Sequence, residues 1–119
     1  MAENMKKFTK KEMEFNRNDD KMRLRLSELQ RTLDKIYLGG GQNKIDKHHS
    51  KGKLTARERI DYLLDTSKDV IEIAAFAGDQ MYTEHGGCPS GGVEVKIGYV
   101  NSRQCIVVAN DATVKAGAW

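Results

Sequence analysis

The stretch VEVKIGYVNSRQCIVVAN, residues 93–110, decides the fold of this 119-residue chain. In its first half, apolar residues at every second position alternate with Glu94, Lys96 and Gly98, which is typical of a half-buried β-strand. Residues 101–103 predict a tight turn, and residues 105–109 predict a returning strand that is apolar on both faces. Such a strand needs cover on both sides, so the hairpin predicts a layered α/β domain.

A long helix is predicted before the hairpin. It begins at a capping residue, Asn18 or Asp19, and ends at the glycines 39–41. Residues 1–17 before it are polar and read as frayed or loosely helical. The apolar stripe recurs at spacings of four and three, which places it on one helix face: Met22, Leu26, Leu29, Leu33 and Ile36.

A second, shorter helix is predicted from a capping box. In the sequence Thr55-Ala-Arg-Glu58, the threonine hydroxyl and the glutamate carboxylate can each accept a hydrogen bond from an amide at the helix start. The residues expected on the buried face of this helix are Ile60, Leu63 and Leu64.

The other segments set the expected organisation. Residues 39–53 read as a flexible, basic connector, residues 70–76 as a candidate strand and residues 78–92 as a long loop. We therefore expect a helical lead-in with its basic, glycine-rich connector over residues 1–53. The start of a folded domain follows over residues 54–119.

Charge and composition narrow the class of protein. The net charge of +3 combines +6 over residues 1–68 with −3 over residues 69–119. The basic half can attract phosphates of a nucleic acid, an anionic membrane or a phosphorylated cofactor, or it can be an ordinary solvated surface. No apolar run of about 18 residues and no signal peptide is present, so we expect a cytoplasmic protein. Cys88 and Cys105 lie outside any CxxC spacing, which favours reduced thiols.

Two segments resemble a known family. LGGGQNKIDKHHSKGKLTARERIDYLLD (residues 38–65) and GGVEVKIGYVNSRQCIVVANDATVKAGAW (residues 91–119) closely resemble the amino-terminal part of biotin-dependent acyl-CoA carboxyltransferases. These are the beta subunits of propionyl-CoA and methylcrotonyl-CoA carboxylases and their relatives. The resemblance covers roughly residues 33–119. It implies a crotonase-like fold, a spiral of ββα units, of which we expect only the amino-terminal helices and the first strands, in truncated form.

The resemblance also implies an activity and its partners. The family transfers a carboxyl group from carboxybiotin to the α-carbon of an acyl-CoA, through an enolate that backbone amides stabilise. Because the sequence has no Met-Lys-Met biotinylation tripeptide, biotin is expected on a partner, the biotin carboxylase or biotin carrier subunit. A homo-oligomer is expected, without nucleic acid or membrane as partner. We expect this segment alone to be inactive.

The resemblance assigns the candidate coenzyme A site first to residues 115–118. We expect Lys115, Ala116, Gly117 and Ala118 to line the CoA pocket, the last three through their backbone, since small residues let main chain and ligand approach. The alternative is a tight strand-to-helix corner without a ligand. The family usually has glycine at position 116, so a positive φ there would cost Ala116 about 1 kcal/mol.

A basic group is the second candidate for the CoA site. Lys53 and Arg57, in a cluster that also holds Lys51 and Arg59, are expected to contact CoA phosphates, because the amides at a helix start add positive potential. The alternative is that Arg57 and Arg59 form structural ion pairs with carboxylates such as Glu58 or Asp61.

No metal site and no catalytic side chain is expected. The spacing of His48, His49, His85 and Cys88 matches no common zinc framework. Two functions without catalysis stay open, a basic helical nucleic-acid-binding module and an assembly module. The interruption of the basic residues by acids, and the lack of interleaved aromatic residues, argue against nucleic acid.

Overall fold

The computed structural model describes residues 8–118, so predictions for residues 1–7 and Trp119 lie outside the described residues. The chain forms two compact units, residues 1–32 and residues 33–119. Helix α1 (Lys10–Tyr37) runs across this division. Among the described helices, none is both long enough and apolar enough to cross a bilayer.

Helix α1 begins at Lys10, well before the predicted capping residue Asn18 or Asp19. The hydroxyl of Thr9 accepts a hydrogen bond from the Glu12 amide at 3.2 Å, and the Glu12 carboxylate accepts one from the Thr9 amide at 2.7 Å. This is a second capping box, which was not predicted from the sequence. Of the predicted apolar stripe, Ile36 is buried, whereas Met22 and Leu26 are more than half exposed.

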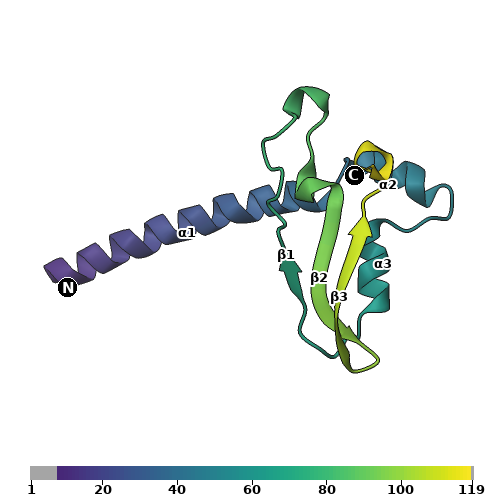
Figure 1. Ribbon diagram of the computed structural model, residues 1–119. Coiled ribbons are helices and arrows are strands. Elements are labelled where there is room, and N and C mark those ends of the chain that lie inside the picture. The colour runs from purple at the N-terminus through teal and green to yellow at the C-terminus, as the bar shows by residue number, and fades with distance from the viewer. Residues whose placement is uncertain (1–7, 119) are drawn as a thin grey trace, which may run out of the picture. The chain divides into compact units, whose positions relative to one another are not determined.

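The second unit contains two short helices and one antiparallel sheet. Helices α2 (Gln42–His49) and α3 (Ala56–Leu63) precede strands β1 (Ile71–Ile73), β2 (Val93–Val100) and β3 (Arg103–Asn110). The strand order is β1-β2-β3, and α3 runs along one face of the sheet (Figure 1). The predicted fold class, helices followed by the strands of an α/β domain, is confirmed.

The hairpin of β2 and β3 has the predicted tight turn. Asn101 and Ser102 form it with φ values of 49° and 65°, which matches the twist of a two-residue hairpin. The Asp65 carboxylate accepts hydrogen bonds from the amides of Asn101 at 3.0 Å and Ser102 at 2.7 Å. The segment after α3 therefore fixes this end of the hairpin.

The buried face of the sheet is the polar one. Glu94 and Lys96 are 5% and 7% exposed, because α3 covers their face. The opposite face leaves apolar side chains exposed: Ile71, Ile73, Ile106 and Val108. The half-buried character of β2 is thus confirmed, but the cover expected on both faces of β3 is not found in the part of the chain that the structure describes.

Helix α3 has the predicted capping box but a narrower buried face. The Glu58 carboxylate accepts from the Thr55 amide at 2.7 Å, and the Thr55 hydroxyl accepts from the Glu58 amide at 3.3 Å. Ile60 and Leu64 are 2% and 6% exposed, whereas Leu63 is 50% exposed. The expectation for Leu63 was wrong because Leu64, the extended residue that follows the helix, is the one that packs on the sheet, against Gly98 of β2.

Two segments differ from the sequence-based expectation. The connector over residues 39–53 contains the two-turn helix α2, in which the side-chain nitrogen Nε2 of Gln42 donates to the Asp46 carboxylate at 2.8 Å. The strand expected over residues 70–76 is limited to β1, because Ala74 takes a positive φ of 58° and turns the chain.

Candidate functional site

The segment after β3 forms a left-handed turn. Lys115, Ala116 and Gly117 have φ values of 44°, 57° and 78°. The amides of Gly117 and Ala118 donate to the carbonyls of Val114 and Lys115, at 2.9 and 3.1 Å. The amides of Lys115 and Ala116 have no acceptor among the described residues, and both residues are exposed. The turn therefore offers two adjacent N–H donors to an external oxygen.

Ala116 adopts the conformation for which the family pattern has glycine. Its φ of 57° lies in the left-handed region, which strains a residue with a Cβ by about 1–2 kcal/mol. Glycine also makes the unfolded chain more flexible, which offsets about 0.4–1 kcal/mol of the relief. We therefore expect Ala116→Gly to raise the free energy of unfolding by about 0.5–1 kcal/mol in urea denaturation.

Ala118→Gly is the matched control for that substitution. Ala118 has an ordinary φ of −70°, so glycine there relieves no strain and is expected to destabilise slightly. Equal destabilisation by both substitutions would contradict the left-handed conformation of Ala116.

The side chain of Lys115 contacts the loop between β1 and β2. Its ammonium lies 4.7 Å from the ring centre of Tyr82, a cation–π distance. Tyr82 is half exposed, so the ammonium stays at the surface beside the turn. The Lys115 ammonium is thus held against an aromatic side chain of this loop.

A basic pocket adjoins the left-handed turn. The open pocket has a volume of about 510 Å³ and is lined by His48, Lys53, Leu54, Arg59 and Ala112. Ala112 is also a neighbour of the turn, because a Cβ on Gly117 would lie 3.5 Å from the Ala112 Cα. The structure therefore brings Lys53 to the same part of the surface as residues 115–118. His48 was not predicted as a site residue, and Arg59 was predicted only as a member of the wider basic cluster.

The position of Lys53 depends on a link between α2 and α3. His49 Nε2 lies 2.9 Å from both carboxylate oxygens of Glu58, the residue that also caps α3. The hydrogen bond from His49, together with the Thr55 amide, lowers the pKa of the Glu58 carboxyl. This link fixes both ends of the short segment that carries Lys53.

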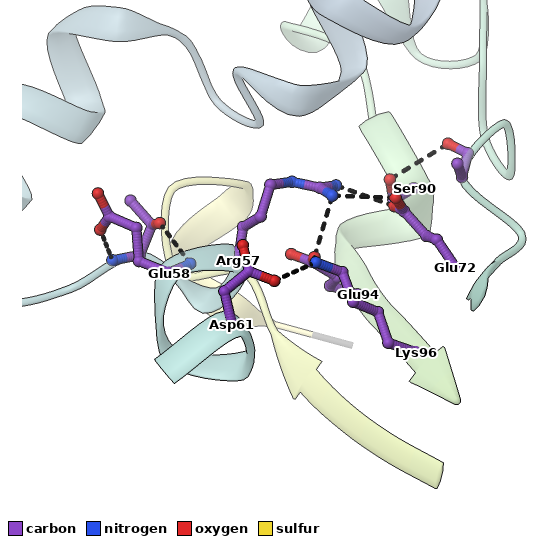
Figure 2. A network of polar contacts seen from close by, with 9 residues as sticks. Arg57, Glu58, Asp61, Glu72, Ser90, Glu94 and Lys96 are labelled. Carbon is purple, nitrogen blue, oxygen red and sulfur yellow. Dashed lines mark hydrogen bonds and ion pairs between the residues drawn. The ribbon is translucent and has the colours of Figure 1, made fainter. Parts of the chain in front are cut away.

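Arg57 points to the other side of α3, into the sheet (Figure 2). Its two terminal nitrogens donate to the two oxygens of Glu72, at 3.0 and 2.9 Å. The Arg57 nitrogen Nη1 also lies 3.1 Å from Glu94 Oε1. The guanidinium carbon lies 4.2 Å from the ring centre of Tyr37. The expected ion pair is therefore present, but its partners are Glu72 and Glu94 rather than Glu58 or Asp61.

Lys96 completes this buried cluster of charges. Its ammonium donates to the Asp61 carboxylate and lies 3.2 Å from Glu94 Oε1. Burial lowers the pKa of Lys96, but these two carboxylates outweigh that effect and the net shift is upward. Burial raises the pKa of the Glu94 carboxyl, and the charges of Arg57 and Lys96 offset only part of the rise.

Glu94 is the residue of this cluster whose carboxylate is not fully hydrogen-bonded. Its Oε1 is buried and within ion-pair distance of two cations, yet no donor meets hydrogen-bond geometry with it. The cluster of Arg57, Asp61, Glu72, Glu94 and Lys96 joins α3 to β1 and β2. It is a structural ion-pair network between helix and sheet.

The described residues contain no cluster of three or more His, Cys, Asp and Glu side chains that could hold a metal ion. Cys88 and Cys105 are both free. Neither thiol lies among the residues that line the basic pocket.

Comparison with known proteins agrees with this arrangement of helices, hairpin and turn. A family model described as "Carboxyl transferase domain" matches residues 47–119. The probable methylcrotonoyl-CoA carboxylase beta chain of Drosophila melanogaster is 41% identical over 92% of this chain and 19% of its own length. The biotin-dependent 3-methylcrotonyl-coenzyme A carboxylase beta1 subunit of Mycobacterium tuberculosis is 42% identical over 84% of this chain and 18% of its own length.

Solved structures show the same likeness. The transcarboxylase 12S hexamer with hydrolysed methylmalonyl-coenzyme A bound has a TM-score of 0.73 at 32% identity, over 82% of this chain and 20% of that one. The geranyl-CoA carboxylase beta subunit of P. aeruginosa has a TM-score of 0.69 at 28% identity, over 87% of this chain and 19% of that one.

The chain belongs to the carboxyl transferase family. It spans about a fifth of the length of the curated relatives it matches. The resemblance inferred from residues 38–65 and 91–119 is confirmed, and so is the predicted crotonase-like fold class of these carboxyltransferases.

Proposed function

We propose that this chain forms part of the acyl-CoA site of a biotin-dependent carboxyltransferase subunit. The observation that carries the proposal is the match of the carboxyl transferase domain to residues 47–119. Relatives named as acyl-CoA carboxylase beta chains, and a relative solved with methylmalonyl-coenzyme A, support it. The reaction transfers a carboxyl group from carboxybiotin to the α-carbon of the acyl-CoA, through an enolate.

The left-handed turn is the proposed contact with the CoA ester. Ala116, Gly117 and Ala118 line the site through their backbone, and Lys115 adds a positive charge at its edge. The open amides of Lys115 and Ala116 suit an anionic or carbonyl oxygen of the ligand. We assign no catalytic side chain to the described residues.

The basic pocket is the proposed contact with the CoA phosphates. Lys53 lines it together with His48 and Arg59, and the residues Lys53 and Arg59 are exposed. Arg57 was predicted to share this role, but its guanidinium is engaged by Glu72, Glu94 and Tyr37. We propose that Arg59 contacts phosphate and that Arg57 acts indirectly, by holding α3 on the sheet.

The wider assembly follows from the same proposal. Carboxybiotin is delivered on a biotin carboxylase or biotin carrier partner, and the complete protein is a cytoplasmic homo-oligomer. The hexamer assembly named for the solved transcarboxylase supports the oligomer. Nucleic acid and membrane have no part in this function.

The phosphate contact is tested by comparing coenzyme A with dephospho-coenzyme A, which lacks the 3′-phosphate. We expect Lys53→Met and Arg59→Met each to weaken CoA binding by roughly 2- to 5-fold, the effect of losing one solvent-exposed ion pair. Isothermal titration of the full chain with both ligands measures it. A loss of affinity for CoA alone indicates that the substituted residue contacts the 3′-phosphate. An equal loss of affinity for both ligands indicates that it contacts the pyrophosphate.

Lys51→Met is the matched control, because Lys51 is an exposed lysine of the same connector that does not line the pocket. Its CoA affinity should equal that of the unaltered chain. Equal CoA affinity of all three variants would overturn the assignment of the basic pocket.

A further inference from the structure

The left-handed turn is anchored by one buried hydroxyl, that of Thr113. Thr113 is 3% exposed. Its Oγ1 accepts a hydrogen bond from the Gly40 amide at 2.9 Å and donates one to Asp111 Oδ1 at 2.6 Å. The same Asp111 oxygen accepts from the Thr113 amide at 2.9 Å. The hydroxyl of the buried Thr113 thus donates one hydrogen bond and accepts another.

The partner of this hydroxyl comes from the glycines that end α1. A Cβ on Gly40 would lie 1.8 Å from the backbone oxygen of Thr113, and a Cβ on Gly39 would lie 2.4 Å from Asp111 Oδ2. The main chain at Gly40 therefore contacts the main chain of Thr113 directly, and the main chain at Gly39 contacts the side chains of Asp111 and Thr113. Both segments belong to the same compact unit.

The turn continues directly from this contact. Val114 is 3% exposed, and its amide donates to the Asp111 carbonyl at 3.0 Å. At the far end, the Asn110 side chain donates to the Gly117 carbonyl at 3.2 Å. Two residues after Thr113 the chain enters the left-handed conformation, so the orientation of the open amides depends on how residues 111–114 are held.

We propose that Thr113 is a positioning residue for the acyl-CoA site: through Gly40 and Asp111 its hydroxyl fixes the orientation of the Lys115 and Ala116 amides. Thr113 itself is buried and does not contact the ligand. The inference rests on the proposed function for its ligand, but the orientation of the two amides can be measured without any ligand. By this inference, the glycines that end α1 also help to fix the geometry of the site.

The test compares Thr113→Val with Thr113→Ser in the full, isotope-labelled chain. Valine keeps the shape but removes both hydrogen bonds of the hydroxyl, whereas serine keeps them. In NMR spectra without ligand, we expect valine to shift the amide resonances of residues 115–117 and serine to leave them in place. In titrations with CoA, we expect valine to bind roughly tenfold more weakly, and serine to restore binding.

These readouts separate a positioning role from general stabilisation. A purely structural role would lower the stability of Thr113→Val but leave the 115–117 resonances and the CoA affinity of the folded molecules unchanged, which would overturn the proposal. If the unaltered chain does not bind CoA, the proposed function fails, and the amide shifts still decide the positioning role. If Thr113→Val does not fold, hydrogen exchange of the unaltered chain decides: a Gly40 amide that exchanges as fast as an unprotected one would contradict the contact.

Discussion

Arg57→Met is expected to lower the free energy of unfolding by about 3–5 kcal/mol, because it leaves buried carboxylates without their main counter-charge. The Arg57 side chain is 22% exposed, and its partners Glu72 and Glu94 are 16% and 6% exposed. Water can therefore compensate little of the lost interaction. Urea denaturation of the full chain at neutral pH measures the effect. Arg59→Met, at an exposed arginine two residues along α3, is the control and should change stability by less than about 0.5 kcal/mol.

The same variant should show an altered pH dependence. Burial raises the pKa of Glu94, and the charge of Arg57 counters part of that rise, so the pKa of Glu94 rises further without Arg57. A carboxyl whose pKa is raised in the folded state destabilises the fold when ionised, and this cost is relieved as the pH falls through that pKa. The stability gap between Arg57→Met and the unaltered chain should therefore narrow from about pH 7 toward the unfolded pKa near 4.3. A gap that is constant or widens toward acid would contradict this role of Glu94.

Gly40→Ala is expected to destabilise the chain by more than about 3 kcal/mol. The added methyl would lie 1.8 Å from the backbone oxygen of Thr113 and 2.5 Å from its carbonyl carbon. Because both atoms belong to the main chain, they cannot move aside as a side chain can, and the contact between the end of α1 and residues 111–113 must open. Thermal denaturation followed by circular dichroism measures the loss.

Gly52→Ala separates this clash from ordinary backbone strain. Gly52 has a φ of 69°, but no atom lies within 4 Å of its added Cβ. Its substitution should therefore cost only the conformational penalty of about 1–2 kcal/mol. If Gly40→Ala costs no more than Gly52→Ala, the close contact of Gly40 with Thr113 is wrong.

Local signals in the sequence predicted local structure well. The capping box at Thr55 and the two-residue turn of the hairpin are both present, because each depends on residues within four positions. The same logic applied to Thr9 and Glu12 would have placed the start of α1 correctly. Helix α2 was missed because its glycine-rich flanks suggested a flexible connector.

The burial of the sheet could not be predicted in the same way. Alternation in β2 defines two faces, but it does not say which face a helix covers. Here the polar face is covered, since Arg57 and Asp61 on α3 supply partners for Glu94 and Lys96. Such pairings join residues 35 positions apart in the case of Lys96 and Asp61, so only the folded chain shows them.

The candidate site could be predicted from the sequence only in part, because some of its contacts also join residues that are distant in the sequence. Small residues and the family pattern identified residues 115–118, and the structure shows the left-handed turn there. The basic group was harder, because Arg57 and Arg59 are only two positions apart, and helical geometry sends them to different sides of α3. Thr113 gave no signal in the sequence, since its partner Gly40 is 73 positions away.

Carboxyl transfer by the chain within its complete reading frame tests the proposed function most directly. The protein is combined with an active biotin carboxylase and biotin carrier, ATP, labelled bicarbonate and a panel of short, branched and long acyl-CoA esters. We predict ATP-dependent transfer of label to at least one acyl-CoA, which is lost when the biotin carrier is omitted. Absence of labelled product from every ester, with the biotin carrier shown to be carboxylated, would contradict the proposal that this chain serves an acyl-CoA carboxyltransferase.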